Sequence, residues 1–165
     1  MKKVLLMAAA AATLAATAPV QAGSFTLSAG RVEPDTKGFD TATTANLRYG
    51  IEILDVGLIE FDAEVEGATD ISSGETANGR DYGFDSVGAG LSARTAGPLY
   101  FIGRYGIARN RLDIDGGGSS TETQQSIGVG LGASIALTQF ELMATHYPEE
   151  GAIDDVTWVT VGVRF

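Results

Sequence analysis

The stretch LIEFDAEVE, residues 58–66, alternates in side-chain character without a break. Its apolar residues occupy the odd-numbered positions from Ile59 to Val65, and its acidic residues occupy the even-numbered positions from Glu60 to Glu66. Successive side chains of a β-strand point to opposite faces, so a period of two predicts a strand with one apolar and one acidic face.

The same alternation recurs along most of the chain. It predicts eight strands, at residues 24–32, 46–53, 58–66, 86–94, 99–108, 126–137, 141–147 and 156–165. The strand at 99–108 is ambiguous in phase, although Arg104 favours the side of Tyr100 and Ile102 as its polar face. The strands are about as long as the roughly 9–11 residues that a tilted membrane-spanning strand needs.

The predicted connections alternate between short and long. Three hairpins close within three or four residues, whereas polar segments at 33–43, 67–81, 111–125 and 148–155 join the other strands. Short turns at one end and long loops at the other are typical of outer-membrane barrels. The predicted fold is therefore all-β, an eight-stranded antiparallel up-and-down transmembrane β-barrel.

The first 22 residues predict an export signal. Lys2 and Lys3 precede an apolar run at 4–16, and Val20-Gln21-Ala22 offers a cleavage site, so we expect a signal peptide at 1–22 and one barrel domain at 23–165. Without the two lysines, nine basic residues face twenty-one acidic ones, a net charge of 9 − 21 = −12. This balance argues against nucleic acid as a partner, and the absence of cysteine excludes disulfides.

Alternation alone does not separate a membrane barrel from a soluble one, and a lipocalin-like periplasmic carrier is the competing interpretation. The polar faces are rich in glycine and serine, which fit the narrow interior of an eight-stranded barrel. Their larger charged residues nearly balance in sign, as charges enclosed in a lumen must. This predicted lumen charge network consists of Arg48, Glu52, Glu60, Asp62, Glu64, Arg94, Arg104, Glu141 and Arg164.

The segment VTWVTVGVRF, residues 156–165, alternates to its final Phe165. Here the sequence resembles the small outer-membrane barrel family of OmpA, OmpX and opacity-type proteins. The resemblance implies that the closing strand is read by the barrel-assembly machinery, with an assembly signal at Trp158, Val161, Val163 and Phe165. It also implies an outer-membrane location, both chain ends on the periplasmic side, a monomer, and outer-membrane lipid and lipopolysaccharide as surroundings.

Three motifs are candidates for catalysis or metal binding. His146 resembles the catalytic histidine of lipid A deacylase barrels, but Pro148 stands where that family has its serine nucleophile. The acids of 60–64 could serve as paired catalytic carboxylates, but no nucleophile accompanies them, which favours a structural role. DIDGGG, residues 113–118, starts like a calcium loop but lacks its closing glutamate. We therefore expect no catalytic residue, cofactor or metal.

The predicted function is structural or surface-interactive, in membrane integrity or adhesion. Two alternatives remain open. One is a narrow pore for small solutes or ions, which requires the network around Arg48, Glu52, Glu60 and Arg104 to open. The other is a lipid-modifying barrel enzyme that uses His146.

Overall fold

A computed structural model describes residues 23–35, 38–136, 138–149 and 155–165. The predicted signal peptide at 1–22 lies outside the described residues. The strands are β1 (Gly23–Pro34), β2 (Ala42–Asp55), β3 (Ile59–Ser72), β4 (Gly74–Glu75), β5 (Asp81–Thr95), β6 (Leu99–Ile114), β7 (Gly118–Ile135), β8 (Thr138–Tyr147) and β9 (Val156–Arg164).

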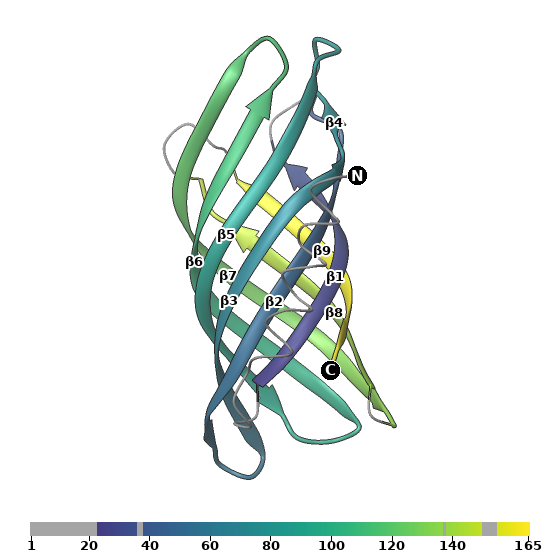
Figure 1. Ribbon diagram of the computed structural model, residues 1–165, viewed down its shortest axis with the longest axis vertical. Helices are drawn as coiled ribbons and strands as arrows, with labels where there is room; N and C mark the ends of the chain where they lie inside the picture. The colour runs from purple at the N-terminus through teal and green to yellow at the C-terminus, as the bar shows by residue number, and fades with distance from the viewer. Residues whose placement is uncertain (1–22, 36–37, 137, 150–154) are drawn as a thin grey trace.

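The long strands form one closed antiparallel sheet. Neighbours follow the order β3-β2-β1-β9-β8-β7-β6-β5, and pairing of β3 with β5 closes the ring. The two-residue β4 pairs only with the start of β5. Figure 1 shows the strands wrapping obliquely around a common axis, with the hairpin of β2 and β3 at one end and that of β6 and β7 reaching beyond the other. This strand order and closure confirm the predicted eight-stranded up-and-down barrel. Because the ring is closed, the backbone N–H and C=O groups of the wall are paired between strands.

The faces of the wall are inverted relative to a soluble protein. On β3, the alternate residues Asp62, Glu64 and Glu66 are buried, whereas Val65 between them is 55% exposed. The other long strands repeat this pattern with apolar side chains outward, as Val129 on β7 shows. A barrel with an aliphatic outside and a polar inside is built to sit in hydrocarbon.

Glycine on the inner face makes room for larger side chains from neighbouring strands. A Cβ atom built on Gly132 would lie 2.1 Å from Cζ of Tyr100, and one on Gly130 would lie 2.1 Å from Sδ of Met143. These contacts explain why β7 carries glycine at every second position from 128 to 132. The inside of the barrel is therefore filled by side chains.

Two connections differ from the predicted loops. Most of 111–125 is strand, because β6 runs to Ile114 and β7 begins at Gly118, with pairs such as Leu112 opposite Ser120. Much of 67–81 is strand as well, since β3 continues to Ser72. Between Arg111 and Thr123 both faces of the β6–β7 hairpin are at least partly exposed, so polar residues such as threonine form strands there without an apolar face. Composition alone therefore made these segments look like loops.

No helix in the described part of the chain is long and apolar enough to cross a membrane.

Candidate functional site

The barrel interior holds a network of ion pairs centred on Glu64 of β3. Its carboxylate accepts from Arg104 at 2.7 Å and from Arg94 at 3.1 Å, and Arg48 lies 3.6 Å away. The Ser92 hydroxyl donates a further hydrogen bond of 2.9 Å. A carboxylate with this many donors is stabilised as an anion despite its burial.

Two other carboxylates extend the network across the lumen. Asp62 accepts from Arg94 and lies 3.2 Å from Arg164 of β9. Glu141 of β8 lies 3.4 Å from Arg48 and 3.5 Å from Arg94. Side chains from β2, β3, β5, β8 and β9 thus meet inside the ring, so the pairs brace opposite walls of the barrel.

The network is balanced in charge. Its four arginines face four carboxylates, with members Arg48, Arg94, Arg104, Arg164, Asp62, Glu64, Glu66 and Glu141. Burying any one of these charges alone would cost several kcal/mol, of order 3–5 for a pair broken on one side. The charges inside the barrel must therefore balance for the folded state to be stable. This requirement is the physical basis on which the charge network was predicted from the sequence.

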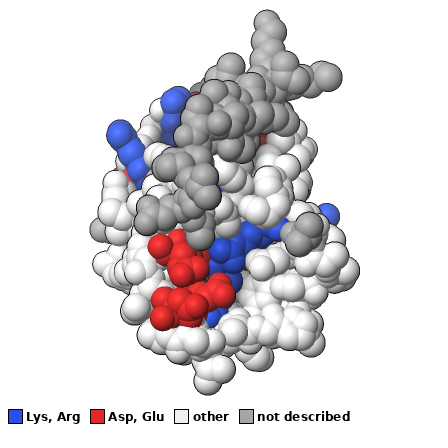
Figure 2. Space-filling model, turned by 60° about the horizontal axis from the view of Figure 1, so that its bottom comes forward, with Lys and Arg blue, Asp and Glu red and all other residues white. Residues whose placement is uncertain are grey.

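The structure does not bring two of the predicted network residues into it. Glu52 is exposed, because in the described part of the chain β1 begins at Gly23, opposite Ile51, so Glu52 has no β1 residue beside it. Glu60 is half-buried at the mouth, opposite Arg94 in register, and makes no ion pair with any described residue. Figure 2, turned toward this short-turn end, shows a group of acidic side chains beside basic ones.

Besides Ser92, three participants were not part of the predicted network. Glu66 pairs with Arg104 at 3.1 Å and accepts from Asn46 at 3.3 Å. Gln139 accepts from Arg164 at 3.2 Å. The period of two already places Glu66 on the same face as Glu64, so the sequence pattern could have assigned Glu66 to the network. Asn46 and Gln139 are uncharged, so an argument from the balance of positive and negative charges could not identify them.

An apolar cluster fills the interior on the loop side of the ion pairs. It contains Val32, Ala68, Phe84, Ala108, Tyr147, Val156 and Trp158. Trp158 is 2% exposed, its ring lies 6.4 Å from that of Phe84, and its Nε1 donates to Thr44 at 2.8 Å. A smaller cluster of Tyr100, Ile102 and Met143 lies elsewhere in the interior. The two clusters and the ion pairs together occupy the lumen.

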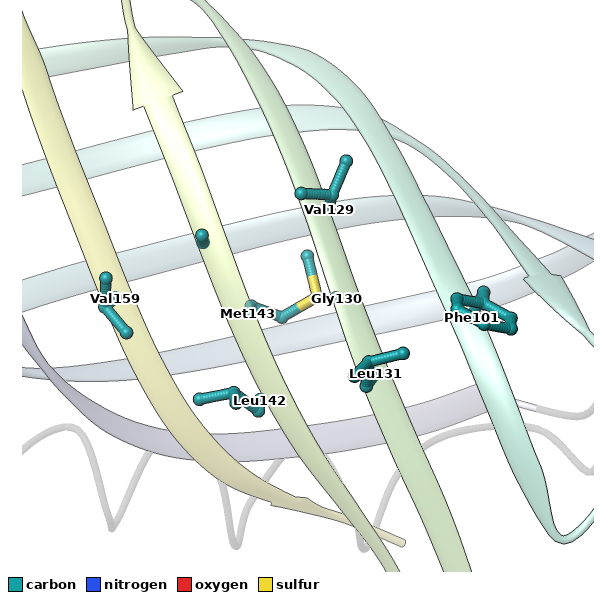
Figure 3. Close-up of a pocket in the computed structure, with 8 residues that line it drawn as sticks. Phe101, Val129, Gly130, Leu131, Leu142, Met143 and Val159 are labelled. Atoms are coloured by element: carbon teal, nitrogen blue, oxygen red, sulfur yellow. The ribbon is translucent and has the colours of Figure 1, made fainter.

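The outer wall is apolar and slightly hollowed. A groove of about 380 Å³ runs across β6, β7, β8 and β9, lined among others by Phe101, Val129, Leu142 and Val159. Figure 3 shows these residues on four neighbouring strands of the wall. Grooves of this shape accept hydrocarbon chains without losing a hydrogen bond, because nothing polar is desolvated.

A polar collar bounds the apolar wall on the loop side. On seven of the eight long strands, all except β3, the outward-facing position where apolar side chains end carries a polar residue. The collar residues are Arg31, Thr43, Asp85, Arg109, Gln125, His146 and Thr157. Tyr105, one step below, donates to Gln125 at 3.1 Å. An aromatic ring with its hydroxyl turned to a polar rim is typical of a membrane interface.

Beyond the collar, Tyr82 of β5 is almost fully buried. Its hydroxyl donates to the carbonyl oxygen of Asp40. Burial raises the pKa of the Tyr82 phenol to about 12, because the phenolate would lose its hydration. This side chain therefore anchors the connection between β1 and β2 to the projecting strands.

The terminal segment takes part in the wall. Val161 and Val163 share the outward phase of β9, and Trp158 points inward. Phe165 is 65% exposed and exchanges two backbone hydrogen bonds of 2.9 Å with Phe25 of β1. The predicted assembly signal therefore lies at the seam where the first and last strands meet.

The motifs considered for catalysis or metal binding lie apart from one another. His146 is exposed on the outer wall, opposite Thr157 of β9. Asp113 and Asp115 lie at the turn between β6 and β7. Among the residues that the structure describes, no group of three or more acidic or histidine side chains is arranged to hold a metal ion.

Comparison with known proteins gives a consistent result. A family model described as "Outer membrane protein beta-barrel domain" matches residues 4–147. The fold resembles Neisserial surface protein A, with a TM-score of 0.61, 14% identity, and 86% of this chain and 95% of that chain covered. No curated protein matches the chain.

Two further barrels share the architecture. The outer membrane enzyme PagL gives a TM-score of 0.56 at 12% identity, with 86% of this chain and 98% of that chain covered. The attachment invasion locus protein Ail of Yersinia pestis gives 0.51 at 17% identity, with 87% and 96% covered. At such identities the likeness establishes the fold alone.

Proposed function

Because this chain belongs to the family of outer membrane protein β-barrel domains, we propose that it serves in the outer membrane as a structural barrel that presents an acidic surface for contact with other molecules. The observation that carries the proposal is the contrast between a filled interior and a strongly charged loop end. A filled interior offers no room for a substrate, whereas a charged surface offers a place for partners.

The filled interior speaks against an open pore. The recess at the short-turn mouth, lined by Glu60, Arg94 and Tyr100 among others, has a volume of about 40 Å³. That is room for about one water molecule. Conduction would require the pairs of Arg94 with Asp62 and Glu64 to separate inside a low-dielectric space, which is costly.

The geometry also speaks against lipid-modifying catalysis. His146 faces outward with Thr157 as its cross-strand neighbour, and Pro148 lies two residues further along the chain. A histidine base needs a nucleophile within hydrogen-bond reach. The described residues provide no hydrogen bond between His146 and a hydroxyl group. Resemblance to PagL in fold does not supply that missing partner.

The loop end is the surface available for interaction. Among the described residues beyond or within the collar, twelve are acidic and four are basic, a net charge of 4 − 12 = −8. The acidic residues are Glu33, Asp35, Asp40, Asp70, Glu75, Asp81, Asp85, Asp113, Asp115, Glu122, Glu149 and Asp155, and the basic residues are Arg31, Arg80, Arg109 and Arg111. Such a surface attracts basic partners and divalent ions that bridge to lipopolysaccharide.

Cells with and without the protein test this proposal. Loss of the barrel should raise uptake of a hydrophobic fluorescent dye through the outer membrane or reduce attachment of cells to a basic protein surface. Wild-type protein in planar bilayers should show no steady conductance, and His146→Ala should leave the lipid A profile of the cells unchanged. If loss of the protein changes neither dye uptake nor attachment, or if the barrel conducts steadily, the proposed role is wrong.

A further inference from the structure

We propose that Arg109 and Arg111 of β6 form a binding site on the outer rim for the phosphate of a lipid headgroup, an inference that rests on the proposed position of the barrel in the outer membrane. Both side chains face outward at the loop side of the apolar wall. Together with Asp85, Ser86, Val87 and Thr121 they line a hollow of about 300 Å³.

The height of this hollow on the wall indicates a lipid. The outward residue directly below Arg109 is Ile107, which is 57% exposed, and the apolar wall continues from there toward the short turns. In cross-strand register Arg109 lies between Val87 and Thr123, so hydrocarbon and polar side chains meet at this row. A phosphate on a lipid headgroup occupies the same boundary between hydrocarbon and water. A free phosphate ion has no reason to prefer that level.

The charge of the site contrasts with its surroundings. The loop end carries twelve acidic and four basic residues among those described, yet two of these four basic residues line this one hollow. The planar guanidinium group presents paired N–H donors that match phosphate oxygens. Two arginines separated by one residue on a strand point to the same face, so both reach the same hollow.

The guanidinium groups are available to a ligand. Arg109 makes no ion pair with any residue in the described ranges. Arg111 lies 2.8 Å from Asp113, but both side chains are about half exposed, and such surface pairs contribute little. Asp85 also lines the hollow, where its carboxylate accepts from Thr69 at 2.6 Å and opposes an anionic ligand. Asp85 thus limits the affinity of the site, and removing its charge should strengthen binding.

Native mass spectrometry of the folded barrel in neutral detergent, titrated with diphosphoryl lipid A as the probe, tests this inference. Arg109→Gln and Arg111→Gln should each weaken binding about tenfold, since each removes charge-assisted hydrogen bonds. Asp85→Asn should tighten binding. Arg31→Gln, which removes a collar arginine on β1, should leave affinity unchanged. Retained mobility of the unboiled protein on gels checks that each variant is folded.

Three results would overturn the inference. The first is equal affinity of wild type and the Arg109→Gln/Arg111→Gln double variant. The second is an equal loss with Arg31→Gln, which would mean unspecific attraction. The third is displacement of the lipid by excess inorganic phosphate, which would assign the hollow to the free ion. A negative result here, with dye uptake or attachment still dependent on the protein, would leave the proposed function standing without this site.

Discussion

Within β3, Val65 is 55% exposed and Asp62 is 1% exposed, although only three positions separate them. The outer face of the wall excludes charge and tolerates changes of shape, because hydrocarbon adapts to any apolar contour. The inner face accepts charge but only in pairs, and it tolerates no added volume, because its space is fixed by the closed ring. Substitutions on the two faces should therefore destabilise the barrel for different reasons.

The largest effect should come from breaking the inner face at its centre. Glu64→Ala removes the carboxylate shared by Arg48, Arg94 and Arg104 and leaves buried positive charge unpaired. We expect a loss of about 3–5 kcal/mol in the free energy of unfolding. Urea unfolding in lipid vesicles, followed by the fluorescence of Trp158, measures it. The matched control Glu52→Ala removes an exposed acid and should change stability by less than about 0.5 kcal/mol.

A smaller effect should come from placing a charge on the outer face. Val129 is 64% exposed near the middle of the apolar wall. Val129→Arg should destabilise the barrel by about 2–4 kcal/mol in vesicles, as a cation near the bilayer midplane does. Ser119→Arg, on the same strand but beyond the collar, should be close to neutral. Equal effects of the two substitutions would mean that hydrocarbon does not contact Val129.

The tolerance of the two faces for volume can be compared with a pair of glycines. A methyl group at inward Gly132 would collide with the Tyr100 ring, whereas outward Gly103 has nothing within 4 Å of the same position. Gly132→Ala should therefore cost about 1–3 kcal/mol, and Gly103→Ala should cost almost nothing. The urea midpoint of each variant tests the difference, and a reversed order would contradict the assignment of the faces.

The smallest effect concerns the projecting strands beyond the collar. The raised pKa of Tyr82, about 12 in the folded protein, lies above the ordinary value near 10. Between these values the unfolded chain releases a proton that the folded protein keeps, so this contribution to stability is present below pH 10 and is lost as the pH rises toward 12. At pH 11 the loss should reach about 1.4 kcal/mol. Tyr82→Phe should lack this increment, and the difference between its urea midpoints at pH 9 and pH 11 measures it.

Much of the wall could be predicted from the sequence, because a period of two follows directly from strand geometry. Arg48 and Glu141 could be assigned to the inner face from phase alone. The ends of strands could not be predicted in this way. Glu52 continues the alternation of β2 yet is exposed past the last residue that pairs with β1, because the phase of a strand predicts the face of a residue but not where the neighbouring strand ends.

The collar and the arginine pair of β6 could not be predicted from the sequence either. Arg109 and Arg111 are in phase with the outward-facing apolar residues of β6, so the alternation pattern of the sequence gives no reason for two charged residues on that face. Only the register between strands places Arg109 between Val87 and Thr123, and Arg111 between Asp85 and Thr121. The boundary of the apolar wall is a property of eight strands together.

The central claim, that the aliphatic face touches hydrocarbon and the ionic face is enclosed, can be tested with single cysteines, since the chain contains none. Fluorescent labels at Val129 and Val161 in lipid vesicles should be quenched by lipids that carry a quencher on the acyl chain and should resist aqueous iodide. A label at Ser119 should respond to iodide alone. Strong quenching by iodide at Val129 and Val161, with no effect of the quenching lipids, would contradict the account.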